Sequence, residues 1–331
     1  MTREQYAAML KDISETHKAG GNTAACIAKY NERYKFMYIY NDNVFKILFG
    51  NPENEKMTID FLNAVLGFIG SDCINNLAYI NPALPDAFGK SITSDIVATD
   101  QRLDRIVLEV QHVEDDSYNA RLVLYTAKHT IASRIKGEGY DLQNLNLISL
   151  QMFDGFPNSP NYRHSIRFKN QENEEFYDKQ TITLVEIPKF LKGNFATDNS
   201  RIAEWLRVID GLNNETPVAV PEGSPFALLQ EKAQLSIFTE EFLVSEAMKM
   251  SDHKYELYVE KKHARKEGLE EGRAEGRAEG RAEGLTEGAD AKAREMATAM
   301  LADGDSVEKV VRISKLPEAE VLAIKANLTQ K

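Results

Sequence analysis

Cysteine and long apolar runs are both scarce in this sequence. Two cysteines, Cys26 and Cys73, occur among 331 residues, and neither lies in a CxxC motif or a histidine cluster. This excludes a disulfide framework and a cysteine-based zinc site. No apolar run approaches the roughly 18 to 20 residues that span a bilayer. The first residues also lack the basic and apolar regions of a secretory leader, so we expect a cytoplasmic protein without a membrane segment.

Positively charged residues are also fewer than negatively charged ones. The chain has 40 Lys and Arg against 51 Asp and Glu, and its formal net charge is −11. Proteins that coat nucleic acid by bulk attraction are basic, because neutralised phosphates dominate such affinity. The charge balance therefore argues against simple DNA coating. It remains compatible with an enzyme that acts on DNA, because a local basic groove and bound divalent cations can offset an acidic average.

The composition is otherwise that of a globular protein, with 43% hydrophobic and 27% charged residues. Composition and pattern divide the chain into five predicted segments. They are a peripheral helical N-terminal arm (1–35), a domain that mixes helices and strands (36–215), a helical extension (216–262), a Gly/Glu/Arg repeat that forms a helix or a linker (263–289), and a small helical C-terminal unit (290–331).

Helical spacing identifies three helices of the mixed domain. Apolar residues at intervals of three and four predict helices over 44–49, 57–68 and 116–136. An amphipathic helix buries its apolar stripe, which in the third helix is formed by Leu124, Ala127, Ile131 and Ile135. On the polar side of that helix, Arg121, Tyr125 and Lys128 follow at spacings of four and three. They could face a phosphate or steady a site, or they could form an ordinary solvated face.

A predicted hairpin brings two carboxylates together. Alternation with period two predicts strands over 91–100 and 105–111, joined by a polar loop at 100–104, and later strands over 146–153 and 181–187. Because strand side chains alternate between faces, Glu109 and Gln111 share one face. This loop places Thr93 opposite Gln111 and Asp95 opposite Glu109, with about 4.5 to 5.5 Å between the Cβ atoms of the two carboxylate residues.

Two like charges in that arrangement destabilise a sheet unless a cation lies between them. Mg²⁺ or Mn²⁺, which prefers oxygen ligands, would offset the repulsion between Asp95 and Glu109 and would give the pair a function. The alternative is that both are ordinary exposed carboxylates on the solvated side of a half-buried sheet. The pattern alone leaves both interpretations open.

The segment from Glu267 to Gly288 repeats glycine at every fourth position. Each glycine costs a helix about 1 kcal/mol relative to alanine, and the repeat has no apolar stripe to bury. It is either a solvated spacer or a helix that pairs with a second copy, which would make the protein a homo-oligomer. Three short helices are expected after it, over 292–301, 306–314 and 317–326.

Several short motifs occur in a fixed order along the chain. They are Asp42-x-x-Phe45-Lys46-x-x-Phe49-Gly50, Ser94-Asp95-Ile96, Glu109-Val110-Gln111, Arg121-x-x-x-Tyr125, Gly139-Tyr140, Glu186-Ile187-Pro188-Lys189-Phe190 and Glu204-Trp205-Leu206. Their order and spacing resemble the recombination-promoting nuclease (Rpn) family of transposase-related proteins, which belongs to the PD-(D/E)XK nuclease superfamily. The resemblance extends from about Met37 to the C-terminal end and includes the glycine repeat and the small helical unit.

The resemblance implies an α/β fold with a PD-(D/E)XK restriction-endonuclease-like core in segment 36–215, followed by a helical C-terminal tail. That core is a four-stranded mixed sheet flanked by helices. By motif position, Asp95 and Glu109 take the metal-binding roles. Gln111 stands where the wider superfamily commonly has lysine, and Asp42 matches an acidic residue of the first helix that can approach the metal.

The leading hypothesis from the sequence is a divalent-metal-dependent DNA endonuclease, a hydrolase linked to recombination or mobile elements. Asp95, Glu109 and Gln111 would be catalytic, with Mg²⁺ or Mn²⁺ held by the two carboxylates and Gln111 orienting water or phosphate through its amide. We expect supporting or phosphate-facing roles for Asp42, Arg121, Tyr125 and Lys128. One alternative is a weak or inactive member of the fold that acts as an oligomeric DNA-binding or regulatory module. Another is a metal-dependent hydrolase of a different phosphodiester.

Overall fold

A computed structural model describes residues 1–81, 83–84, 92–114, 117–133, 142–193, 195, 197–251 and 290–329, together with positions 265, 273, 277 and 288. The chain divides into two compact units, Met1–Ser251 and Asp252–Lys331. None of the helices in the described residues is both long and apolar enough to cross a membrane.

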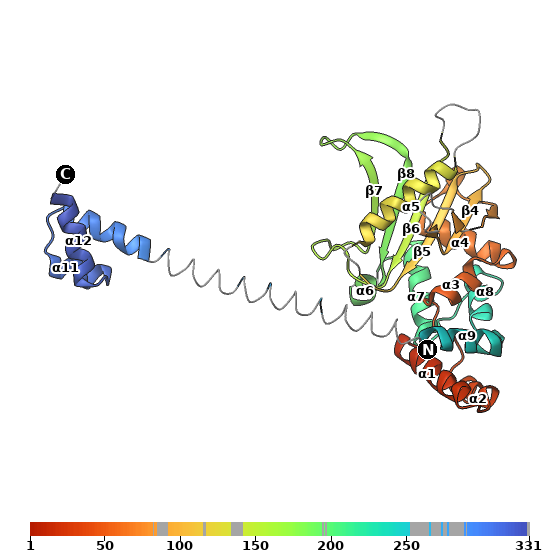
Figure 1. Ribbon diagram of the computed structural model, residues 1–331. Coiled ribbons are helices and arrows are strands. Elements are labelled where there is room, and N and C mark those ends of the chain that lie inside the picture. Colours follow the sequence, from red (N-terminus) through yellow and green to blue (C-terminus); the bar gives the residue numbers. More distant parts are fainter. Residues whose placement is uncertain are drawn as a thin grey trace. The chain divides into compact units, whose positions relative to one another are not determined.

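A six-stranded mixed sheet forms the centre of the larger unit (Figure 1). Its strands, in spatial order, are β1 (Leu77–Tyr79), β4 (Ile96–Asp100), β5 (Arg105–Gln111), β6 (Leu145–Gln151), β8 (Glu175–Glu186) and β7 (Arg163–Lys169). The pairs β5–β6 and β6–β8 are parallel, and the other neighbours are antiparallel. The expected mixed sheet is confirmed, but it has six strands rather than four because β1 and β7 extend its two edges.

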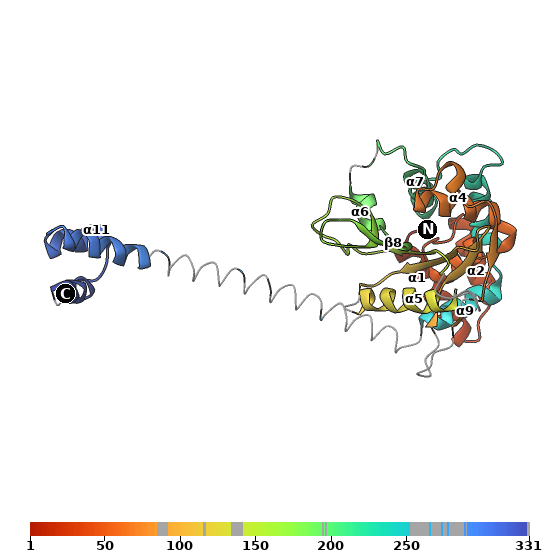
Figure 2. The same ribbon diagram turned by 90° about the horizontal axis from the view of Figure 1, so that it is seen from above.

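Helices cover both faces of this sheet (Figure 2). On one face lies α5 (Tyr118–Ala132), which packs on an apolar layer formed by Val97, Val107, Leu145, Leu147 and Leu184. The other face belongs to the main core, to which α3 (Asp42–Phe49), α4 (Glu55–Leu66) and α7 (Arg201–Asn213) contribute. Short helices and strands complete the unit: η1 (Pro52–Asn54), η2 (Gly70–Asp72), β2 (Ala83–Leu84), β3 (Ile92–Thr93), α6 (Ile187–Lys192), α8 (Pro225–Lys232), η3 (Leu235–Ile237) and α9 (Glu240–Met250).

The apolar stripe predicted for α5 is wrong. Leu124 is 49% exposed and Ile131 is 74% exposed, whereas Leu122, Thr126 and His129 are buried against the sheet. The helix tolerates this because its buried polar groups have partners. Thr126, for example, donates its hydroxyl proton to the Leu122 carbonyl at 2.8 Å. The fourth residue of the expected stripe, Ile135, lies outside the described residues.

The N-terminal helices belong to the main core. Helices α1 (Arg3–Lys18) and α2 (Thr23–Arg33) pack against each other and against α9. The side chains of Tyr6, Met9, Leu10 and Ile13 are buried on α1, which gives this segment an apolar face that the predicted peripheral arm did not include.

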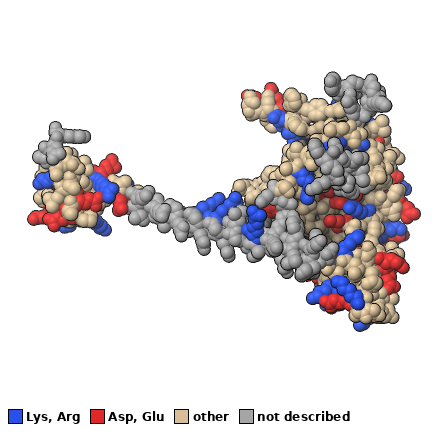
Figure 3. Space-filling model, in the orientation of Figure 1, with Lys and Arg blue, Asp and Glu red and all other residues tan. Residues whose placement is uncertain are grey.

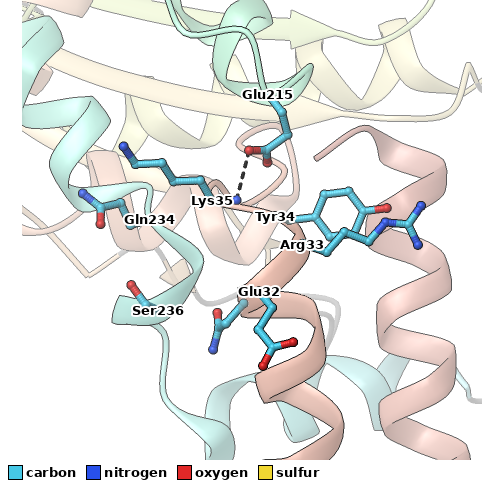
Figure 4. Close-up of a pocket in the computed structure, with 8 residues that line it drawn as sticks. Glu32, Arg33, Tyr34, Lys35, Glu215, Gln234 and Ser236 are labelled. Carbon is cyan, nitrogen blue, oxygen red and sulfur yellow. Dashed lines mark hydrogen bonds between the residues drawn. The ribbon is translucent and has the colours of Figure 1, made fainter.

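Glu215 anchors the start of the chain to the segment that follows α2. Its carboxylate accepts hydrogen bonds from the Met1 ammonium at 2.8 Å, from the Lys35 amide at 2.9 Å and from the Phe36 amide at 3.1 Å. Figure 4 shows the polar pocket beside this contact, with the bond to Lys35 drawn. Because the described wall residues of the pocket include neither Asp95 nor Glu109, the pocket is separate from the predicted site.

The smaller unit contains the three expected short helices. Residues 290–302 are helical, and α11 (Val307–Ser314) and α12 (Glu318–Thr329) follow. Ala297, Val310, Leu316 and Val321 form its small apolar core. Most of the glycine repeat lies outside the described residues, so its structure and its role in oligomerisation stay predictions.

A chain that ends at Ser251 is expected to fold. All helices and strands that build the sheet and its two helical layers lie before this position. Its thermal transition should remain cooperative, with a melting temperature within about 3 °C of that of the full chain. Calorimetry on both proteins checks this. A truncated protein without a cooperative transition would show that residues after 251 stabilise the larger unit.

Candidate active site

The hairpin forms with the predicted register. Thr99 pairs with Arg105 and Val97 pairs with Val107, but the ladder ends at Ile96 and Leu108. Asp95 lies at a bend just before β4. The predicted opposition of Thr93 and Gln111 is wrong, because Thr93 belongs to β3, which pairs with β2 instead.

The bend turns the Asp95 side chain toward the end of β5. Its Oδ2 accepts the backbone N–H of Val110 at 2.8 Å, and its own N–H donates to Glu109 Oε1 at 3.3 Å. Each carboxylate is therefore tied to the other strand by a backbone hydrogen bond. The structure brings Asp95 and Glu109 together, as the hairpin pattern predicted.

Burial changes the acidity of both carboxyl groups. Desolvation and the nearby charge of Asp95 raise the pKa of Glu109 to about 8. Desolvation also raises the pKa of Asp95, although the Val110 amide and Lys46 oppose it. Two carboxylates held together in this way repel each other, so the site favours a proton or a cation.

Lys46 is a site residue that we did not predict. Its Nζ lies 2.9 Å from Asp95 Oδ1, and it reaches the hairpin from α3, which packs against β5. Burial acts to lower the pKa of Lys46, but the hydrogen bond and the charge of Asp95, with the neighbouring acidic groups, raise it overall. A sequence clue existed, because Asp42 and Lys46 are four residues apart and so lie on one side of a helix.

A buried chain of hydrogen bonds runs from Arg105 through His129 and Ser94 to Glu109 and orients its carboxylate. Arg105 Nη1 lies 3.3 Å from His129 Nδ1, and His129 Nε2 lies 2.9 Å from Ser94 Oγ. Arginine can only donate, so Nδ1 accepts and Nε2 carries the proton. Burial and the charge of Arg105 lower the pKa of His129 to about 4, which keeps the ring neutral. Ser94 thus accepts from His129, which leaves its own proton for its hydrogen bond to Glu109.

The amide of Gln111 is bound at both ends. Its Oε1 accepts from Arg121 Nη2 at 2.7 Å, and its Nε2 donates to the Val113 carbonyl at 2.7 Å. Arg121 also lies over the Tyr118 ring, 5.1 Å from the ring centroid. In this structure Gln111 therefore holds a guanidinium group beside the hairpin.

If the protein nicks DNA as the sequence predicts, Gln111→Ala should reduce the rate of plasmid nicking by about tenfold, because Arg121 loses the group that holds it. Gln111→Lys should reduce it further, since an ammonium would face the Arg121 guanidinium. Kinetics of plasmid nicking with Mg²⁺ measure both effects. Gln171→Ala, in the exposed turn between β7 and β8, is the control. Activity in Gln111→Lys at or above that of the unmodified protein would contradict this role.

The other predicted residues lie around this centre. Asp42 is half-exposed, and its Oδ1 lies 3.1 Å from His112 Nε2. Its charge acts on both Asp95 and Lys46. Tyr125 is half-buried on α5, and burial together with the charge of Glu109 raises its pKa. Lys128 is half-buried on the same helix, three residues further along.

A row of polar side chains continues the site across the carboxyl ends of three neighbouring strands. The register pairs Gln111 with Gln151 and Gln151 with Glu186, across three parallel strands. Glu186 is fully buried and binds His164 Nε2 at 3.0 Å and Lys189 Nζ at 2.5 Å. Sequence reasoning noted Glu186 and Lys189 only as parts of a motif. The parallel strand pairing that aligns Glu186 with Gln111 is not visible in the sequence.

The donor set fits a hard divalent cation. Among the residues that the structure describes, no three or more His, Cys, Asp and Glu are grouped as metal ligands. Asp95 and Glu109 nevertheless offer carboxylate oxygens, and Mg²⁺ is commonly bound by one or two carboxylates, with water and substrate phosphate as the other ligands. Burial and the charge of Asp95 raise the pKa of Glu109, so a bound cation would stabilise its ionised form.

Comparison with known proteins identifies the family. The sequence matches the family described as PD-(D/E)XK nuclease family transposase over residues 39–271, which is more than half of the chain. The match includes α3, the hairpin and α5. Neither the curated proteins nor the solved structures gave a match. The resemblance noted in the sequence is confirmed, and the chain belongs to the PD-(D/E)XK nuclease family transposases, which links it to nucleases and to mobile elements.

Proposed function

We propose that this protein is a divalent-metal-dependent endonuclease that hydrolyses phosphodiester bonds of DNA during recombination or movement of mobile elements. The observation that supports it best is the meeting of two partly buried carboxylates, Asp95 and Glu109, at the end of a hairpin. Family membership supports the same class of chemistry.

In this proposal Asp95 and Glu109 hold Mg²⁺ or Mn²⁺. When bound, the ion lowers the pKa of a coordinated water and offsets the charge that develops on the phosphate. The protein keeps its ligands in place through the Val110 amide on Asp95 and through Ser94 on Glu109. Gln111 cannot act as a general base, because an amide does not titrate in the useful range. Its contribution is to position Arg121.

DNA is the proposed substrate even though the protein is acidic. On the face drawn in Figure 3, Lys and Arg are interspersed with Asp and Glu over the described residues of the larger unit. Non-specific attraction should therefore be weak, and affinity should depend on a few cations near the site, such as Arg121 and Lys46, and on the bound metal. This charge distribution favours local recognition of one phosphate over coating of a long duplex.

Plasmid nicking by the purified protein tests the proposal. Supercoiled DNA should be converted to the nicked circle with Mg²⁺ or Mn²⁺ and should remain intact with EDTA. DNA binding without nicking under every metal condition would instead support the non-enzymatic alternative.

A further inference from the structure

The ammonium group of Lys46 lies where the carboxylate pair most needs positive charge. Its Nζ is 2.9 Å from Asp95 Oδ1, while Oδ2 of the same carboxylate is taken by the Val110 amide. The Asp95 side chain is only 12% exposed and that of Lys46 is 35% exposed. The two groups thus form a partly buried ion pair, in which loss of one partner leaves a charge without compensation.

Lys46 interacts with more than one acidic group of the site. Its charge acts on Glu109 and Asp42 as well as on Asp95. It stands on α3, whose Val44, Phe45 and Leu48 are buried in the main core, so the base of its side chain is fixed while the ammonium extends to the hairpin. A rigid helix is a better platform for such a group than a loop.

The end of β5 supplies no cation of its own. Gln111 carries an uncharged amide, whose oxygen accepts from Arg121 and whose nitrogen donates to the Val113 carbonyl. The positive side chain that directly contacts a carboxylate of the pair comes instead from a distant part of the sequence.

We propose that Lys46 is the built-in counter-ion of the Asp95 and Glu109 pair, and that it supplies the positive charge which Gln111 cannot. This inference rests on the proposed function. In the metal-free protein Lys46 stabilises the pair. A divalent cation that binds Asp95 competes with it, and the displaced ammonium stays beside the reaction centre, where it is a positioning group for the phosphate.

The decisive variant is Lys46→Gln, because its metal affinity should rise while its stability and its nicking activity fall. Without metal, the melting temperature should fall. Mg²⁺, titrated calorimetrically into the purified protein, should bind about fivefold or more tightly, because it no longer competes with an ammonium. Nicking at saturating Mg²⁺ should nevertheless fall by about tenfold or more. A residue that only supports the fold would not tighten metal binding when it is removed.

Two further variants serve as controls. Lys46→Arg retains the charge and should keep Mg²⁺ affinity within about twofold of that of the unmodified protein. Lys56→Gln makes the same change of charge at an exposed position of α4, and it should alter neither metal affinity nor nicking. Unchanged or weaker Mg²⁺ binding in folded Lys46→Gln would overturn the proposal.

A double-mutant cycle separates this inference from the proposed function. Lys46→Gln and Asp95→Asn, alone and together, are melted without metal. If the pair exists, the double variant should be less destabilised than the sum of the single variants. Additive effects would disprove the counter-ion role. If the unmodified protein neither binds Mg²⁺ nor nicks DNA, the proposed function fails, and this cycle still decides whether Lys46 is paired with Asp95.

Discussion

Glu109→Gln is expected to reduce Mg²⁺-dependent nicking by about 100-fold to 1,000-fold, because an amide is a poor ligand for a hard cation and carries no charge. The substitution keeps the size of the side chain and an oxygen that can accept the Asp95 N–H. The burial that raises the pKa of Glu109 also makes its ionised form costly. The metal-free variant should therefore melt several degrees higher than the unmodified protein at about pH 8.

Asp95→Asn should lose activity to a similar extent but should gain less stability. Its amide oxygen can still accept from Val110, yet the ion pair with Lys46 is lost. Burial raises the pKa of Asp95 as it does that of Glu109, so the charge that is removed is also costly. Lys46, however, then keeps a partly buried charge without a partner, so the metal-free melting temperature should rise less than that of Glu109→Gln. Unequal stability changes with equal loss of nicking would identify both residues as functional and distinguish their surroundings.

Nicking rates and melting curves of the two variants, measured beside Glu222→Gln as an exposed control, provide this comparison. Residual nicking in Glu109→Gln close to that of the unmodified protein would remove Glu109 from the metal site. A contaminating nuclease would leave all three variants equally active.

The hairpin was predictable because its determinants are local. A polar loop of fixed length and strict alternation set the register, and the register alone places Asp95 near Glu109. The bend before β4 was not predictable, since Ser94 and Asp95 continue the alternating pattern in the sequence. It depends on β3 pairing with β2 and on the contacts that Asp95 makes with β5.

The orientation of α5 was predicted wrongly for a related reason. Apolar side chains lie on more than one side of this helix, so periodicity could not decide which stripe is buried. The stripe that carries His129 is the buried one, because the His129 ring forms hydrogen bonds there with Ser94 and Arg105. Lys46 and His129 reach the site from separate helices, and a pattern within one strand pair contains no information about such partners.

The apparent affinity for Mg²⁺ is expected to depend steeply on pH. With the pKa of Glu109 raised to about 8 by burial and by Asp95, the metal-free site retains a proton at neutral pH. The ion needs the deprotonated carboxylate, so binding must release that proton. Each unit below about pH 8 should weaken the apparent affinity about tenfold, and the dependence should flatten above that value.

The raised pKa of Glu109 also determines how the stability of the metal-free protein changes with pH. The folded pKa of Glu109 lies above its ordinary value of 4.5, so the folded protein binds the proton more tightly than the unfolded chain does. This stabilisation is complete below about pH 4.5 and is lost as the pH rises through about 8. The gain in melting temperature of Glu109→Gln should therefore be small near pH 5 and largest near pH 8, without metal.

Calorimetric titration of Mg²⁺ in two buffers with different ionisation enthalpies measures the proton release directly. About one proton per bound ion is expected near pH 7, and the number should approach zero near pH 9. His129 should not contribute, because burial and Arg105 lower its pKa to about 4, below this range. Affinity that is constant between about pH 6 and 8, without proton release, would mean that Glu109 is already ionised in the metal-free protein. The charge on the pair would then be fully balanced by Lys46 and its neighbours, and the hairpin would bind a cation without the competition from protons that its burial implies.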